Sequence, residues 1–311
     1  MAVRIQKADA AVLDARTNLP PKGLVERAAP TLFLIFWSSG FVAAKAGLEG
    51  AAPLTFLSLR FSIVTALMLA IALVLRAPWP STRAELRHLV VLGLVIQAIY
   101  FGCSYLAFGA GITAGGLALI VGMQPVLTAV VAVPLLGERF RPVQLLGLAL
   151  GVAGTALVLH EKLAAGVGTV AGVVISLMAL VAITGGTLYQ KRFCPRFDLW
   201  TGGTIQFATA AIVVSLAALL FEDNTVTWTP AFAAGLGYLV LVSSIVSIAL
   251  LNLMLRRGEA SRVATLFFLV PPGAALVAWL LLGESFGPLA LVGMAVATTG
   301  VALVMRAPRR R

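Results

Sequence analysis

Charge is what this sequence has least of. Only 11% of its 311 residues are Asp, Glu, Lys or Arg, and 60% are hydrophobic, which gives a mean hydropathy of +1.02. Soluble domains carry about 25% charged residues. A soluble core would have to absorb nearly every apolar run of this chain, so the composition indicates a protein that crosses a membrane many times.

Cysteine and histidine are also scarce, with two of each. Cys103 lies in an apolar run and Cys194 in a basic loop, which predicts neither a disulfide framework nor redox chemistry. His88 and His160 lie at helix ends, and no Cys/His cluster has the spacing of metal ligands. There is no P-loop. We therefore expect no enzyme activity, no cofactor and no metal, and a transport step driven by gradients or by exchange.

Acidic residues are missing from the middle of the predicted helices. All twelve Asp and Glu residues fall in the N-terminal arm, in loops or at helix ends. Proton relays normally use a carboxylate or a histidine inside the membrane, and a purely cationic cargo needs a buried negative charge. The sequence thus favours facilitated diffusion or exchange over obligatory proton coupling.

The apolar residues form ten runs that are long enough to span a bilayer, which takes about 20 residues. The runs are 29–47, 53–75, 88–108, 113–136, 142–160, 167–188, 199–221, 231–255, 261–282 and 288–306. If the N-terminus is inside, 20 of the 23 Lys and Arg residues lie on the cytoplasmic side and only Lys162 lies outside. This asymmetry predicts a multi-pass membrane protein with both termini in the cytoplasm, and it explains the net charge of +11 without nucleic acid.

The chain also repeats itself. Residues 118–160 return without a gap as 264–306, with 18 of 43 aligned positions identical, including Pro125 with Pro271 and Glu138 with Glu284. The offset of 146 residues continues along the chain, so we expect a cytoplasmic arm (1–28), a first repeat (29–160), a second repeat (161–306) and a basic cytoplasmic tail (307–311). Each repeat holds five helices. Because five is odd, the second repeat must be inverted. The expected fold class is an all-α polytopic membrane protein of ten helices.

Several motifs carry a resemblance to a known family. They are FLIFWSSGFVAAKAG at 33–47, LRF at 59–61, and the run from Pro125 to Gly137-Glu138, which is repeated from Pro271 to Gly283-Glu284. On these the chain resembles the EamA family of the drug/metabolite transporter superfamily, and YddG-type amino-acid exporters most. The resemblance implies a basket in which helices 1–4 and 6–9 line a central cavity while helices 5 and 10 lie outside. It does not specify the substrate.

Two cations lie within the predicted spans. Arg60 is about 10–12 Å deep in the second helix, where a charged side chain needs a partner or a wet cavity. It either binds a substrate carboxylate or is tied structurally to Glu284, Glu49 or helix carbonyls. Lys45 shares a helical stripe with Trp37 and Phe41, and is either a cation at the outer mouth or a lysine that snorkels to the interface.

Polar side chains on the other cavity helices complete the candidate site, although hydrogen bonds between helices explain them equally well. The expected substrate-binding residues are Trp37, Ser38, Phe41, Lys45, Arg60, Gln97, Tyr100, Gln124, Thr184, Tyr189, Gln190, Ser244 and Asn252. Proline removes a backbone donor from a helix, so we expect hinges at Pro125, Pro271 and Pro272. Glycines in the fifth and tenth helices predict close packing, not a site.

From the residues alone, the expected solute bears a carboxylate and is partly apolar. The resemblance implies that the protein lies in the bacterial inner membrane and exports small amino acids or related carboxylate-bearing metabolites, by alternating access. The alternatives are a transporter of phosphate- or nucleotide-linked metabolites, or of drugs with proton coupling, and a scaffold or receptor without transport. The expected partners are the small-molecule substrate and the lipid bilayer, with no nucleic acid. We expect a monomer, with a dimer as the alternative.

Overall fold

The computed structural model describes residues 24–124, 126–128, 130–131, 142–164, 168–194, 197–256 and 269–306. These residues are almost entirely helical, and they contain no strand longer than the single bridge between Ala51 and Val226. The helices are α2 (Leu24–Gly47), α3 (Pro53–Val74), α4 (Arg83–Leu92), η1 (Gly93–Tyr100), α5 (Phe101–Gly109), α6 (Ala114–Gly122), α8 (Pro142–Ala164), α9 (Val170–Phe193), α10 (Leu199–Phe221), α11 (Pro230–Tyr238), η2 (Leu239–Val246), α12 (Ser247–Arg256), α14 (Val270–Leu282) and α15 (Pro288–Arg306).

The helices have the length and apolar character of membrane spans. Six described helices are long and apolar enough to cross a bilayer, and four shorter apolar helices account for the remaining predicted runs. Large apolar side chains point away from the protein, among them Val74, Leu220 and Phe221. Such exposure suits lipid and not water. The prediction of a polytopic all-α membrane protein is confirmed.

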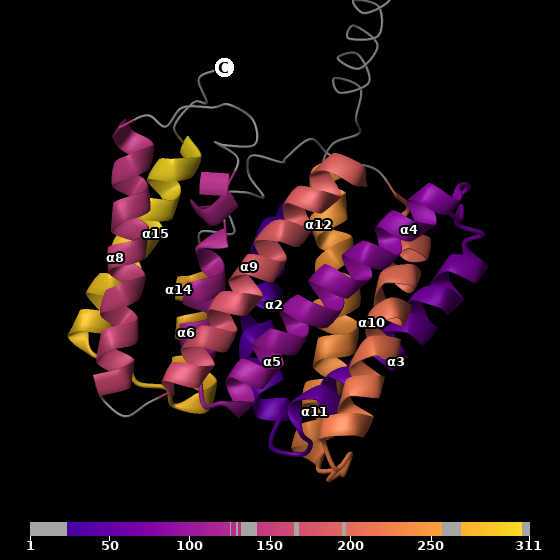
Figure 1. Cartoon of the computed structure of the whole chain (residues 1–311), viewed down its shortest axis with the longest axis horizontal. Helices are drawn as coiled ribbons and strands as arrows, with labels where there is room; N and C mark the ends of the chain where they lie inside the picture. The colour runs from indigo at the N-terminus through magenta and orange to yellow at the C-terminus, as the bar shows by residue number, and fades with distance from the viewer. Residues whose placement is uncertain are drawn as a thin grey trace, which may run out of the picture.

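The helix bounds repeat along the chain. α3 begins at residue 53 and α10 at 199, η1 begins at 93 and η2 at 239, and α5 begins at 101 and α12 at 247. Each pair is separated by the 146 residues that the sequence alignment predicts. Two repeat-related pairs also pack against each other: α3 on α10 near one edge of the bundle, and α8 on α15 at the opposite edge (Figure 1).

The two repeats are inverted relative to each other. α4 and α11 are repeat-related, yet α4 starts at the end of the bundle near the chain termini and α11 starts at the other end (Figure 1). We call the end that holds Arg76, Arg83, Arg87, Lys191 and Arg192 the basic end. The opposite end, which holds Glu49, Glu161, Glu222, Asp223 and Glu284, is the acidic end. An inverted repeat places equivalent helix starts at opposite membrane surfaces.

Glycines bring α8 and α15 into backbone contact, as the sequence predicts. A Cβ atom at Gly154 would lie 2.4 Å from the backbone nitrogen of Ala297, and one at Gly300 would lie 2.4 Å from the nitrogen of Gly151. No side chain fits between backbones this close. The two helices therefore form a closely packed edge of the bundle.

Two carboxylates at the acidic end cap helices that belong to other parts of the chain. Glu222 accepts the backbone N–H groups of Leu54 and Thr55 at the start of α3, at 2.9 and 2.7 Å. Glu161 accepts those of Gly287 and Ala290 at the start of α15, each at 2.7 Å. The first N–H groups of a helix have no partner within the helix, and its N-terminus favours negative charge. These acids therefore hold helix starts in place: Glu161 does so from the last turn of α8, and Glu222 from the residue that follows α10.

Candidate functional site

The candidate site is built around Arg60, the eighth residue of α3. Its side chain is only 3% exposed. Nη1 donates to the hydroxyl of Tyr105 on α5, and Nη2 donates to Oγ of Ser244 on η2, each at 2.9 Å. The guanidinium carbon lies 5.2 Å from the ring centre of Phe101. The cluster thus joins both repeats through one buried cation.

The charge of Arg60 is not neutralised by any residue that the structure describes. Within the described part of the chain it has no carboxylate partner, and its buried Nε has no hydrogen-bond partner. Glu284, one of the partners considered from the sequence, pairs with Lys45 instead. A guanidinium offers five N–H donors in a planar fork that matches a carboxylate. Two neutral hydroxyls leave that capacity partly unused, so the site can still accept an anion.

The cluster breaks the symmetry of the repeats. The residue equivalent to Arg60 is Gln206 on α10, which is also buried. The residues equivalent to Tyr105 and Ser244 are Leu251 and Ala98, which have no polar side-chain atom. The equivalent set of Gln206, Leu251 and Ala98 therefore lacks the cation and both hydroxyl groups. A buried charge is costly in a membrane and normally has a function.

The helices that carry these side chains contain two π-helical segments. η1 (Gly93–Tyr100) carries Gln97 and Tyr100, and η2 (Leu239–Val246) carries Ser244. The two segments occupy identical positions in the two repeats. π-Helical turns are rare and often lie at functional sites. In η1 the buried Oε1 of Gln97 has no hydrogen-bond partner among the described residues.

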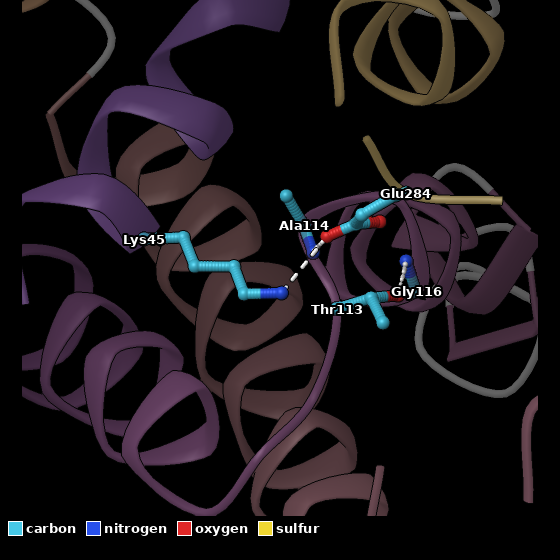
Figure 2. Close-up of polar contacts among 5 residues, drawn as sticks. All are labelled: Lys45, Thr113, Ala114, Gly116 and Glu284. Carbon is cyan, nitrogen blue, oxygen red and sulfur yellow. Dashed lines mark hydrogen bonds and ion pairs between the residues drawn. The ribbon is translucent and has the colours of Figure 1, made fainter. Parts of the chain in front are cut away.

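Lys45 makes a second polar contact between the repeats, at the acidic end (Figure 2). Its Nζ lies 2.9 Å from Oε1 of Glu284, which also accepts the N–H of Ala114, the first residue of α6, at 2.9 Å. Gly283 ends α14 with φ of 65°, a left-handed conformation that glycine adopts readily, and Glu284 follows it. Thr113 caps the same helix start by accepting the N–H of Gly116. Lys45 is therefore paired with an acidic residue of the other repeat.

A cleft of about 690 Å³ opens beside this ion pair. Residues from the ends of α2, α5 and α14 line it, together with the loops that precede α3 and follow α10. They include Lys45, Glu49, Phe108, Asp223, Thr225 and Leu282. The ring of Phe108 lies 6.2 Å from that of Tyr105, the residue that binds Arg60. A layer of aromatic side chains thus separates the cleft from the Arg60 cluster.

The predicted residues of α2 lie where the two repeats meet. Ser38 is buried with Oγ 3.5 Å from the carbonyl oxygen of Val270, and a Cβ atom at Gly273 of α14 would lie 2.7 Å from it. Trp37 is partly buried, with its ring 5.2 Å from that of Phe33. Phe41 is partly buried against the main core.

The polar residues of α6 and α9 divide into two groups. Gln124 donates from Nε2 to Thr187 Oγ1 at 2.8 Å, and the buried Thr184 donates to the carbonyl of Leu180 within α9. Tyr189 lies at the basic end, where its hydroxyl is 2.6 Å from Nδ1 of His88. Gln190 follows it in the last turn of α9. The structure thus places Tyr189 and Gln190 away from the end of α3 on which Arg60 lies.

Two hinge prolines are described and one is not. Pro271 and Pro272 occupy the first turn of α14, where the missing N–H removes no helical hydrogen bond. Pro271 packs against α6, since a Cβ atom at Gly122 would lie 2.5 Å from its Cγ. Pro125 and the side chain of Asn252 lie outside the described residues, and the hinge role stays a prediction.

Sequence reasoning found Arg60 and Ser244 but missed their third partner. Tyr105 lies on α5, five residues after the predicted site residue Tyr100, and the stacking of its ring on Phe56 is a tertiary contact that the sequence does not reveal. The pairing of His88 with Tyr189 was missed as well. Among the described residues, no group of three or more His, Cys, Asp or Glu side chains could hold a metal ion.

Comparisons with known proteins agree with this architecture. The model of the EamA-like transporter family matches residues 31–160 and 170–306. A probable amino-acid metabolite efflux pump of Escherichia coli (strain K12) is 28% identical over 280 residues, which cover 87% of this chain and 91% of that protein. A probable terminal-alkyne amino-acid exporter of Streptantibioticus cattleyicolor is 30% identical over 284 residues, covering 89% and 92%. A crystal structure 20% identical in sequence has the same fold, with a TM-score of 0.60 over 91% of this chain and 96% of the other. The protein is a membrane transporter, and it belongs to the EamA-like transporter family.

Proposed function

We propose that this transporter exports small amino acids or related carboxylate-bearing metabolites across the bacterial inner membrane, and that Arg60 binds the substrate carboxylate. One observation carries the proposal. Arg60 is a buried cation that touches both repeats and lacks an acidic partner among the described residues. A substrate carboxylate in contact with Nε and the remaining donors would neutralise it.

The surroundings of Arg60 favour a zwitterion with an apolar side chain. The ring centres of Phe61 and Phe101 lie 6.0 and 5.2 Å from the guanidinium carbon, so the cation borders an aromatic surface. The free Oε1 of Gln97 is an acceptor that suits an ammonium group. Gln97 precedes Phe101 by four residues on the same helix, which places it about one turn away. The names of the two relatives, an amino-acid metabolite efflux pump and an amino-acid exporter, support the same substrate class.

The charge distribution supports the orientation. Arg76 follows α3, Arg83 and Arg87 lie in the first turns of α4, and Lys191 and Arg192 lie in the last turn of α9. These helix ends gather at the basic end of the bundle (Figure 1). Cytoplasmic loops of membrane proteins carry an excess of Lys and Arg. The basic end then faces the cytoplasm, and the cleft at the acidic end faces the outside.

Facilitated diffusion or exchange fits the acidic residues better than proton coupling does. The carboxylates of Glu161 and Glu222 are each held by backbone N–H groups at helix starts, and Glu284 by Lys45 and Ala114. A proton carrier needs a group that can release its charge inside the membrane. Alternating access would then come from motion between the repeats, with α8 and α15 as the rigid edge.

Efflux from proteoliposomes tests the proposal. Vesicles loaded with labelled Thr, Met or Phe should release label faster than protein-free vesicles, and the rate should survive an ionophore that collapses the proton gradient. If folded protein moves none of these amino acids, the proposed substrate class is refuted, and a scaffold or receptor without transport becomes the favoured alternative. Flux that stops with the ionophore would instead establish proton coupling.

A further inference from the structure

Beside the cleft, the ammonium group of Lys45 is paired with the carboxylate of Glu284, which belongs to the protein itself. Lys45 keeps 33% of its side chain exposed, whereas Glu284 is only 7% exposed. Lys45 is also the only cationic residue among those that line the 690 Å³ cleft. A solute in the cleft can therefore reach this ammonium group even while Glu284 occupies one side of it.

Glu284 is bound asymmetrically. Its Oε1 accepts from both Lys45 Nζ and the N–H of Ala114, while its buried Oε2 has no hydrogen-bond partner among the described residues (Figure 2). A buried acceptor without a donor is unfavourable, so this carboxylate is held less firmly than one with both oxygens bound. A ligand carboxylate in the open cleft keeps its second oxygen in water and avoids that cost.

The cleft also offers acceptors for a positive group. Glu49 and Asp223 line it and are exposed, and the hydroxyl of Thr225 donates to Asp223 Oδ2 at 3.1 Å. A zwitterion placed with its carboxylate at Lys45 would have these carboxylates available for its ammonium group. The charges of the cleft thus match both ends of an amino acid.

The cleft is adjacent to the Arg60 cluster. Phe108 lines the cleft and packs against Tyr105, whose hydroxyl accepts from Arg60. A substrate that leaves Arg60 toward the acidic end meets Lys45 as the next cation. Lys45 and Glu284 come from opposite repeats, so a competing carboxylate at Lys45 also removes a contact between α2 and α14.

We infer that Lys45 is a second carboxylate-binding site on the outward path, occupied in the closed state by Glu284, and that the substrate carboxylate displaces Glu284 there. The ligand class is a zwitterion with a free carboxylate, and this identity rests on the proposed function. The displacement couples the arrival of substrate to the release of the ion pair that holds α2 to α14 and α6.

Protection of a cysteine in the cleft tests the site without any transport measurement. Thr225→Cys is introduced after Cys103 and Cys194 have been replaced by Ala, and its reaction with a membrane-impermeant maleimide is followed in detergent. L-Methionine should slow the reaction, and methionine methyl ester, which lacks the free carboxylate, should not. Protection should persist in Lys45→Arg and disappear in Lys45→Gln.

Glu284→Gln gives the decisive comparison. The amide oxygen can still accept the N–H of Ala114, so the start of α6 stays capped, but the charge that competes for Lys45 is gone. The L-methionine concentration that gives half-protection should fall by up to about fivefold, the value of a partly exposed ion pair. An unchanged or higher concentration, or equal protection in Lys45→Gln, would overturn the site.

The outcome also separates this site from the proposed function. Amino-acid flux in proteoliposomes without protection in the cleft would refute the Lys45 site and leave amino-acid export standing. Protection that depends on Lys45 without flux of any amino acid would refute export and leave the binding site. The unfolding temperature of each variant shows that the protein used is folded.

Discussion

Replacing Arg60 by Gln gives the sharpest test of the candidate site, because the repeat-related position already holds a buried glutamine. Gln206 occupies the equivalent place on α10 and is 7% exposed. Arg60→Gln therefore makes the repeats alike at this position and removes only the cation. Tyr105 and Ser244 lose a charged donor, and the amide of the new side chain can replace one of the two bonds.

The expected loss is large enough to measure. A hydrogen bond to a charged group contributes about 1.5–3 kcal/mol, and 1.4 kcal/mol is a factor of ten in affinity. Arg60→Gln should therefore weaken competition by L-methionine about 10- to 150-fold. The burial of a charged residue in the bilayer, about 2.5–3.5 kcal/mol on insertion scales, is relieved at the same time. Loss of folding is therefore not the expected result.

The assay uses two competitors in the same vesicles. Efflux of labelled methionine is inhibited by L-methionine and by methionine amide, which lacks the carboxylate. The measured quantity is the inhibition constant of the amide divided by that of L-methionine. The ratio should fall about 10- to 150-fold in Arg60→Gln, less in Arg60→Lys, and not at all in Gln206→Ala. A general loss of active protein lowers both rates and leaves the ratio unchanged. An unchanged ratio in folded Arg60→Gln would falsify the assignment of Arg60 as the carboxylate site.

Three further predictions concern packing, capping and reactivity. Gly154→Val should destabilise the protein by about 3 kcal/mol or more because its Cβ would meet the backbone of α15. Gly102→Ala should be neutral or stabilising, because no atom lies within 4 Å of the added Cβ. Thermal unfolding in detergent compares the two variants. Glu222→Ala should lower stability by about 0.5–2 kcal/mol through the uncapped start of α3, and an unchanged unfolding temperature would contradict this. Burial raises the pKa of the Cys194 thiol, so its thiolate fraction at pH 7 is below that of a free cysteine. Alkylation at that residue should be slower than in the unfolded chain and should accelerate as the pH rises through and above the usual thiol pKa; equal rates at pH 7 would show that the thiol is accessible and unperturbed.

The architecture was predictable from the sequence because bilayer thickness and the positive-inside rule act on composition directly. Ten apolar runs and the 146-residue offset determine which helices exist and which are equivalent, and the helix starts at 53 and 199 repeat the offset. The π-helical segments were not predictable. An apolar sequence such as that of η2 satisfies i→i+4 and i→i+5 hydrogen bonding equally well, and the choice depends on packing against neighbouring helices.

The candidate site was predictable only in part, because residue type identifies a polar group but not its partner. Arg60 and Ser244 are 184 positions apart, and Lys45 and Glu284 are 239 apart. Sequence reasoning considered Glu284 as a partner of Arg60, since both are charged groups near the same membrane surface. The structure instead pairs Glu284 with Lys45, because the turn at Gly283 directs Glu284 toward the ends of α2 and α6.

Duplication explains why so few residues distinguish the two repeats chemically. The α3–α10 and α8–α15 interfaces are each formed by two equivalent helices. A substitution in one repeat therefore changes only one of the two sides of such an interface. Positions that face the centre are free of this constraint. Arg60, Tyr105 and Ser244 differ from Gln206, Leu251 and Ala98 without disturbing the helix bounds, which still agree between repeats. Selection on transport can therefore act on one cation and its partners while the inverted scaffold that moves around them stays symmetric.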